Sequence, residues 1–338
     1  MSSISGKQRT RRVLILDHGD RLGGVEKFIA HLCKCGNDYE FERVCVDANN
    51  WRLGYDFYVF IISRRVKFLP DVVVSCHIDT ARLGFRLSKK FDCPHIFREP
   101  SGFKHQFMTS ENASMLKQSA CVALTERGLN RWRDCGFTGR GFVVPPYLPR
   151  IEHKVAVWPS DKNNLEVLFV ANLYPEKRHL EVIDAIRKIN ASSRYEVSLH
   201  IYGVSNQDAH SQVVKQAIER CDFASLSEGG VLSHSQMKAY DFAVLASSHE
   251  GFGNVIIEYI QAGLPFIASN SDGISQMIPS DSILVLPSHT MTWSEAFVAF
   301  IRNPDDVRRE MERLQHFLKI QPSFVQQFKH VIDSQFIA

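Results

Sequence analysis

Residues 250–265 read EGFGNVIIEYIQAGLP, and this stretch decides the fold. Two glycines and small polar residues over 247–253 favour an exposed tight turn. The following residues predict a short helix over 254–262, which a glycine and a proline end. The apolar run 266–269 then suits a buried strand. The stretch therefore predicts one turn–helix–turn–strand unit of an α/β protein.

The start of the predicted helix is a candidate anion site. The first backbone N–H groups of a helix have no partner inside the helix, and the helix dipole favours negative charge there. Gly251 and Gly253 carry no Cβ, so a phosphate can approach the backbone. A diphosphate would repel Glu250 and Glu258, so we expect these carboxylates to accept hydrogen bonds from a sugar or ribose diol. The alternative is an ordinary turn and helix with two solvated glutamates.

This stretch resembles the signature of the retaining, GT-B-fold glycosyltransferases of family 4 (glycosyl transferases group 1). That signature is a Glu, seven residues and a second Glu, with Gly-Phe-Gly after the first and Ala-x-Gly-x-Pro after the second; all of it stands here. The resemblance implies that Glu250 contacts hydroxyls of the donor sugar and that Glu258 holds the ribose diol. It also implies that the backbone amides of Phe252, Gly253 and Asn254 face the diphosphate and the sugar.

Two further loops are similar to phosphate-binding loops of the same family. A strand over 13–17 leads into a loop with Gly23 and Gly24 and then a helix, which is a phosphate-cradle arrangement. A tight strand-to-helix turn is the alternative, and the resemblance places this loop over the donor diphosphate. After a strand over 167–171, Lys177 matches a lysine that clamps the donor phosphates, and it is our catalytic candidate together with Glu250. Asn172 stands where relatives commonly have Arg, and a solvated loop lysine is the alternative for Lys177.

The first half of the chain provides candidates for the acceptor side. His77 follows the predicted strand 72–75, and a structural role is an open alternative for it. Many relatives carry a histidine of the catalytic cleft at the end of the next strand, 95–98, where this chain has Pro100. The other residues expected to line the acceptor side are Arg98, Glu99 and Ser101.

Strands alternate with helices in two runs, which implies two parallel sheets. We expect an α/β protein of the GT-B class, with two doubly wound Rossmann-like domains facing across a cleft. Residues 1–147 form the N-terminal acceptor-side domain, onto which 322–338 crosses back. A proline-bearing linker over 148–160 leads to the nucleotide-sugar-binding domain, residues 161–321.

Composition is that of a soluble globular protein, with 338 residues, 44% apolar and 23% charged. No apolar run reaches the roughly 20 residues of a membrane helix, and the start of the chain shows no secretory signal. The eight cysteines form no Cys-x-x-Cys pair, which fits a reducing cytoplasm. We expect Cys45, Cys76, Cys93 and Cys121 to be small core residues.

Charge is uneven along the chain. Residues 1–150 carry 24 Lys and Arg against 15 Asp and Glu, or +9, and the remainder carries 16 against 22, or −6. The basic first half makes an anionic membrane surface or a phosphorylated acceptor a candidate partner. The protein would then be cytoplasmic and peripheral on the cytoplasmic face of the membrane. No nucleic-acid-binding motif is present, so we expect no nucleic-acid partner.

The resemblance implies a retaining glycosyltransferase of hexosyltransferase type, with attack by the acceptor hydroxyl on the face from which the leaving group departs. The donor is a nucleotide-diphosphate sugar, and the acceptor is a saccharide, a lipid-linked compound or a small molecule. The setting would be bacterial glycan, lipid-linked saccharide or glycoconjugate synthesis. We expect no cofactor and no metal, because the sequence has no His or acidic cluster with ligand spacing. Two alternatives stay open: phosphorolysis or epimerisation on the same fold, and a catalytically silent domain that binds sugar nucleotides or partners.

Overall fold

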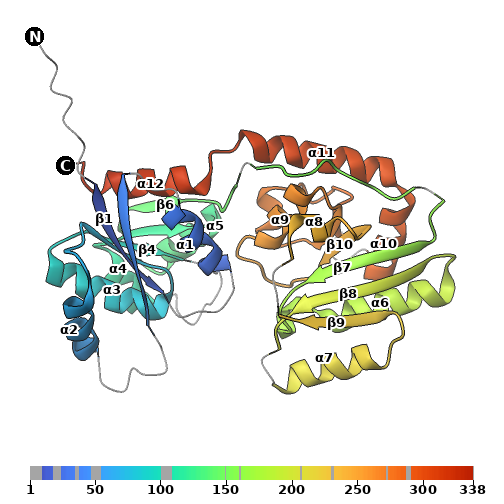
Figure 1. The fold of residues 1–338 in the computed structure, drawn as a ribbon, viewed down its shortest axis with the longest axis horizontal. Helices are drawn as coiled ribbons and strands as arrows, with labels where there is room; N and C mark the ends of the chain where they lie inside the picture. Colours follow the sequence, from blue (N-terminus) through green and yellow to red (C-terminus); the bar gives the residue numbers. More distant parts are fainter. Residues whose placement is uncertain are drawn as a thin grey trace, which may run out of the picture. The chain divides into compact units, whose positions relative to one another are not determined.

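The computed structural model describes residues 10–17, 24–34, 38–46, 55–99, 109–148, 150–159, 161–205, 208–229, 232–271, 273–286 and 291–337. The chain folds as two compact units (Figure 1): the first is Met1–Pro146 with Ser323–Ala338, and the second is Tyr147–Pro322. It therefore passes between the units twice.

The first unit is built on a parallel sheet in the order β2-β1-β3-β4-β5-β6. Its strands are β1 Arg11–Asp17, β2 Tyr39–Cys45, β3 Val72–Ser75, β4 His95–Arg98, β5 Ala120–Ala123 and β6 Gly141–Val143. The inner strands β3, β4 and β5 are buried along their whole length. This is why β3 and β5 read as largely apolar runs rather than as alternating patterns, whereas β4 begins with His95 and ends with Arg98.

Helices pack around this sheet. They are α1 Gly24–Lys34, α2 Tyr55–Arg65, α3 Ile78–Phe91, α4 Ser110–Leu116, α5 Glu126–Asp134 and α12 Phe324–Ser334. The Trp132 ring of α5 packs edge-on against Phe97 of β4, with 5.5 Å between ring centroids. Phe324 and Phe328 of α12 each lie 5.1 Å from the Phe28 ring of α1. The end of the chain is thus part of the first unit's core.

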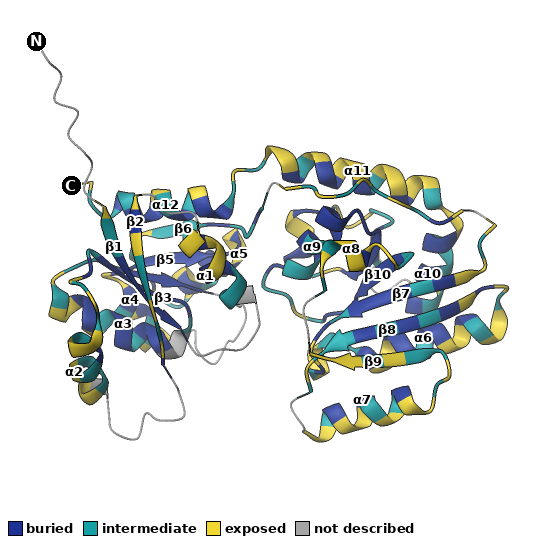
Figure 2. Ribbon diagram, in the orientation of Figure 1, coloured by how far each residue is buried: buried dark blue, intermediate teal, exposed yellow. Residues whose placement is uncertain are grey.

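The second unit repeats this plan with the strand order β12-β11-β10-β7-β8-β9. Its strands are β7 Asn164–Val170, β8 Glu196–Gly203, β9 Ala224–Glu228, β10 Phe242–Leu245, β11 Phe266–Ser269 and β12 Val285–Leu286. Its helices are η3 Pro175–Lys177, α6 His179–Ser192, α7 Ala209–Glu219, α8 His234–Met237, α9 Asn254–Ala262, η4 Ile274–Gln276, α10 Trp293–Arg302 and α11 Pro304–Ile320. Figure 2 shows that β10 is buried and that the edge strand β9 is largely exposed, with further exposed residues on α7 and α11.

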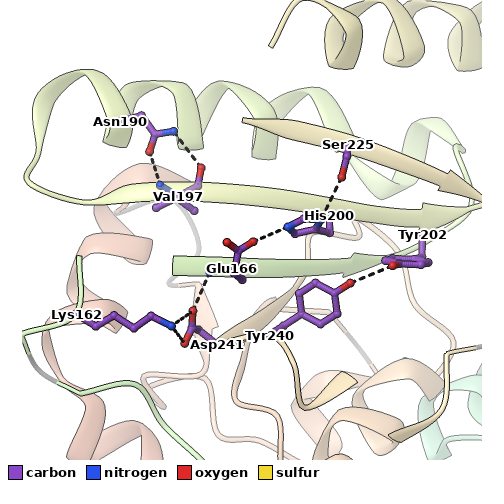
Figure 3. A network of polar contacts seen from close by, with 9 residues as sticks. All are labelled: Lys162, Glu166, Asn190, Val197, His200, Tyr202, Ser225, Tyr240 and Asp241. Atoms are coloured by element: carbon purple, nitrogen blue, oxygen red, sulfur yellow. Dashed lines mark hydrogen bonds and ion pairs between the residues drawn. The ribbon is translucent and has the colours of Figure 1, made fainter. Parts of the chain in front are cut away.

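Polar side chains tie neighbouring strands of the second sheet together (Figure 3). Hydrogen bonds join His200 Nε2 to Glu166 Oε2 at 2.6 Å and His200 Nδ1 to Ser225 Oγ at 3.1 Å. At the start of β10, Asp241 accepts hydrogen bonds from the Lys162 ammonium and from the backbone N–H of Glu166. These contacts link β7 to β8, β9 and β10 on one half-exposed face, and so help to fix the strand register.

The predicted α/β class with two parallel, doubly wound sheets is confirmed. Helix α9 and strand β11 have the bounds predicted for 254–262 and 266–269. Apolar residues recur over 57–69 and predict a helix there, but the helix of this region, α2, ends at Arg65. The prediction that Cys45 is a core residue is wrong, because this last residue of β2 is exposed. Strand β2 lies at the edge of its sheet, where one side of the strand has no neighbouring strand to cover it.

None of the helices that the structure describes is long and apolar enough to cross a membrane.

Candidate active site

Two loops of the second unit meet at the carboxyl edge of its sheet. Strands β7 and β10 are parallel neighbours, so the loops that follow them leave from the same edge. The backbone N–H of Ser248, after β10, donates to the carbonyl of Glu176, after β7, at 2.8 Å. This contact fixes the two loops to each other and brings their polar side chains together.

Lys177 and Glu250 form an ion pair across these loops, between Nζ and Oε1. Their side chains are only 20% and 14% exposed. Ser247 Oγ donates to the same Glu250 oxygen at 2.6 Å. An ammonium has three donors, so Lys177 keeps the capacity to bind a ligand oxygen. The structure therefore brings together the two residues that the sequence proposed as catalytic, which lie 73 positions apart.

The turn before α9 requires glycines. Gly253 has φ of +78°, in the left-handed region that side chains disfavour, and a Cβ there would lie 2.8 Å from Ile274 Cδ1. A Cβ on Gly273 would lie 2.4 Å from the Cα of Phe252. The Phe252 side chain is buried and packs edge-on against Tyr147, with centroids 5.4 Å apart. Phe252 thus anchors the turn through its buried ring and through the close approach of its backbone to Gly273.

The N-terminus of α9 has unpaired hydrogen-bonding groups among the described residues. No side chain among the described residues caps this helix, so its first N–H groups keep their donor capacity. Asn254 Oδ1 is buried and has no hydrogen-bond partner in the described part of the chain. Glu258 lies one helical turn further on and is half-buried, on the same face as Asn254. Gly251 is half-buried in the preceding turn. The donor-side residues 250–254 and 258 are therefore grouped at one helix end.

Asn172 has a structural contact that the sequence does not reveal. Its Oδ1 accepts a hydrogen bond from the backbone N–H of Val204 at 3.0 Å. The Leu173 N–H donates to the carbonyl of Val204 at 3.1 Å, so the loops after β7 and β8 are joined at this point. The neighbouring cation Arg178 lies 3.7 Å from Glu181. Asn172 thus holds the loop that positions Lys177.

A second polar cluster lies at the carboxyl edge of the first unit's sheet. The carboxylate of Asp17, the last residue of β1, is fully buried. Arg43 donates to Asp17 Oδ2 from Nη2 at 2.5 Å and from Nε at 3.1 Å. His77 Nε2 lies 3.2 Å from Asp17 Oδ1. Sequence reasoning proposed His77 but missed Asp17 and Arg43; the one available signal was a carboxylate that directly follows a buried apolar strand.

The Arg98 side chain is buried rather than exposed at the surface. It is 2% exposed, and its guanidinium carbon lies 4.0 Å from the centre of the Phe28 ring. Its Nη1 is buried without a hydrogen-bond partner among the described residues, and burial lowers the pKa of Arg98. Glu99 is also buried, at 6% exposed. Gly24 is the first residue of α1, whereas Gly23, Pro100 and Ser101 lie outside the described residues.

The second unit is similar to a known protein family. Residues 150–315 match the family model described as glycosyl transferases group 1. No curated protein matches the chain. Three similar solved structures each cover 96% of this chain. The structure of Anabaena HepE with UDP and glucose has a TM-score of 0.76 and 16% identity over 100% of its chain. Sucrose-phosphate synthase from Thermosynechococcus elongatus has a TM-score of 0.78 and 13% identity over 99% of its chain.

The third is the lipopolysaccharide outer core galactosyltransferase WaaB, with a TM-score of 0.64 and 15% identity over 99% of its chain. At these identities the likeness establishes the fold, which is GT-B as the sequence predicted. The matched region contains β7 to α10, and with them the grouped residues of the second unit. Residues 150–315 of this GT-B-fold chain therefore match the model of the glycosyl transferases group 1 family.

Proposed function

We propose that this protein is a retaining glycosyltransferase that transfers a sugar from a nucleotide-diphosphate sugar to an acceptor hydroxyl. The observation that carries the proposal is the Lys177–Glu250 pair beside the uncapped N-terminus of α9. The pair offers a cation and a carboxylate, and the helix end offers backbone donors. HepE was solved with UDP-glucose, which supports a donor of this class and makes uridine the first base to test.

The chemistry follows from charge. When the bond between the sugar and the β-phosphate breaks, the phosphate gains negative charge. Donors held in place at that position stabilise it without reorganisation. Lys177 and the first amides of α9 have this role, and Glu250 accepts hydrogen bonds from sugar hydroxyls. The Lys177 ammonium can bind a phosphate oxygen of the donor through a hydrogen that its pair with Glu250 leaves free.

Retention requires that the acceptor oxygen bond to the anomeric carbon on the face from which the phosphate leaves. The acceptor proton then passes to the departing phosphate oxygen. We expect transfer to need no metal and to continue in excess EDTA. An assay for UDP release from UDP-glucose without acceptor tests the donor half of the reaction, since water can replace the acceptor. An inverted anomeric product in the NMR spectrum would contradict retention.

A catalytically silent sugar-nucleotide-binding domain is the second candidate function. The observation that favours it is Asn172, whose amide is engaged with Val204 where relatives commonly have a phosphate-binding Arg. Tight binding of UDP-glucose with no UDP release in an overnight incubation would establish this candidate. Phosphorolysis is distinguished by release of a sugar phosphate when inorganic phosphate is supplied.

We further propose that the basic first unit binds an anionic membrane surface, which fits a lipid-linked acceptor. Helix α2 exposes Phe57 and Phe60, which are 43% and 47% exposed. The guanidinium of Arg64 lies 4.4 Å from the centre of the Phe60 ring, and Arg65 is exposed beside it. An amphipathic surface of this kind binds anionic lipids through burial of its apolar rings and through attraction of its arginines to the headgroups. We expect the protein to bind anionic vesicles, and we expect both added salt and the double variant Phe57→Ser/Phe60→Ser to weaken this binding. Vesicle binding that neither change weakens would contradict the proposal.

A further inference from the structure

A pocket of about 510 Å³ lies on the second unit, and neither the Lys177–Glu250 pair nor α9 contributes a residue to its lining. One wall is the extended segment 154–157 and the other is helix α11. Its polar lining residues are Lys154, Arg308, Glu312, Gln315, His316 and Lys319. None of these residues belongs to the proposed donor site.

The two walls are fixed to the core. Gln315 Nε2 donates to the carbonyls of His153 and Ile260, both at 2.9 Å. The backbone N–H of Ala156 donates to the carbonyl of Gly263 at 3.2 Å. A Cβ on Gly263 would lie 2.2 Å from the carbonyl oxygen of residue 154, so chain and turn are in close contact there. Hydrogen bonds to the rest of the second unit thus hold both walls of the pocket in place.

The charge of the pocket is mainly positive. On α11, residues 308, 312, 316 and 319 recur every three or four positions and so share one helix face. Lys154 faces them from the other wall. With the histidine neutral, three cations against the single carboxylate of Glu312 give a formal charge of +2.

These cations have no carboxylate partner among the residues that the structure describes. On the same helix, Arg309 pairs with Asp306 and Arg313 pairs with Glu310. By contrast, no ion pair to a described residue is formed by Lys154, Arg308 or Lys319. Like charges around one cavity repel each other, and a bound anion removes that repulsion.

We propose that this pocket binds a small ligand that carries one or two phosphate groups. Its volume falls within the range of about 300–1,000 Å³ that is usual for small-molecule sites. Arg and Lys are the residues that bind phosphate oxygens, Arg by two parallel hydrogen bonds and Lys as a point charge. Three cations in the lining of one pocket match a phosphate dianion better than they match a single carboxylate. This inference is independent of the proposed transfer reaction.

Inorganic pyrophosphate is the probe, measured by titration calorimetry. A Lys177→Met background weakens its binding at the donor site, so that the remaining binding reports the pocket. Arg308→Gln/Lys319→Gln is expected to lower the affinity about tenfold, which corresponds to about 1.4 kcal/mol. Arg309→Gln/Arg313→Gln is the matched control, because it removes the same charge from the same helix outside the pocket; it should keep the affinity.

A second arm distinguishes a soluble phosphate compound from a lipid headgroup. Binding to phosphatidylglycerol vesicles is compared between the two double variants, whose first units are identical. Loss of vesicle binding only in Arg308→Gln/Lys319→Gln assigns the site to a headgroup, and loss of pyrophosphate binding alone assigns it to a soluble phosphate. The proposal is overturned if the background protein binds neither probe, or if the control variant loses as much binding as the pocket variant.

Discussion

At the scale of single residues, the candidate site is defined by what its side chains already contact. Lys177 is held by Glu250, which in turn accepts a hydrogen bond from Ser247. The ammonium is therefore positioned before any donor arrives, so little side-chain freedom remains to be lost when it binds a phosphate. Asn254 adds a buried acceptor that still lacks a donor among the described residues.

Replacement of Lys177 by methionine should lower the turnover of donor by about 10²–10³-fold, the usual cost of one lost donor to a developing charge. The aliphatic stem is retained, so we expect the melting temperature to change little. Lys188→Met is the control, since this lysine is exposed on α6 and pairs with Asp184. Turnover in Lys177→Met within threefold of the wild type would show that Lys177 does not stabilise the leaving group.

Gly253→Ala should destabilise the second unit by about 1–3 kcal/mol, the usual cost of a strained backbone conformation, and more if Ile274 cannot move. Gly229→Ala is a matched control: its φ of +80° is nearly the same as the +78° of Gly253, but a Cβ on Gly229 meets nothing within 4 Å. The difference between the two in urea unfolding isolates the contact with Ile274. If the two variants lose the same unfolding free energy, the contact between the new Cβ and Ile274 does not contribute to the loss.

At the scale of elements, a buried histidine joins neighbouring segments in each unit. His95 of β4 hydrogen-bonds to Ser75 on β3 at 2.5 Å and to Ser119 at 2.8 Å. His179, the first residue of α6, stacks on Phe169 of β7, with 4.6 Å between centroids. Burial lowers the pKa of His95 to about 3 and that of His179 to about 4. Both rings therefore remain neutral in the folded protein at moderately acid pH.

Stability should consequently fall as the pH drops below 6.5. The unfolded chain protonates these histidines with a pKa near 6.5, whereas the folded protein resists protonation until about pH 3 to 4. Each should cost about 2 kcal/mol of unfolding free energy between pH 7 and pH 5. Urea unfolding at both pH values measures the loss, and His179→Phe, which preserves the stacking, should remove about half of it. If His179→Phe loses as much unfolding free energy between pH 7 and pH 5 as the wild type, His179 is not a source of the acid sensitivity.

Sequence patterns predict some elements better than others, for physical reasons. The bounds of α9 were predictable because glycines flank it on both sides, and Gly253 and Gly263 are indeed left-handed. The end of α2 was not, because the apolar residues Val66 and Phe68 continue the pattern beyond Arg65 while the helix stops. The role of Asn172 depends on its contact with Val204 across two loops, which no local pattern reveals.

At the scale of the whole molecule, the alternation of strands and helices predicted two doubly wound sheets, and the family signature predicted the grouping at 250–258. Strands of a parallel sheet end at one edge, so residues after different strands meet there. That rule brings Lys177 to Glu250 and His77 to Asp17. The partner of Asp17 was not predictable, since Arg43 reaches it from 26 residues away on the neighbouring strand.

The most direct test of the central claim is a thermal-shift panel of nucleoside diphosphates and their sugars, run on the wild type and on Glu258→Gln. A ligand at 100 times its dissociation constant stabilises the folded state by about 2.7 kcal/mol, or about 5 °C for units of this size. We predict that a uridine nucleotide shifts the wild type by this amount and that Glu258→Gln loses most of the shift. If no nucleotide shifts the wild type, the second unit is not a sugar-nucleotide site and the proposed reaction is wrong.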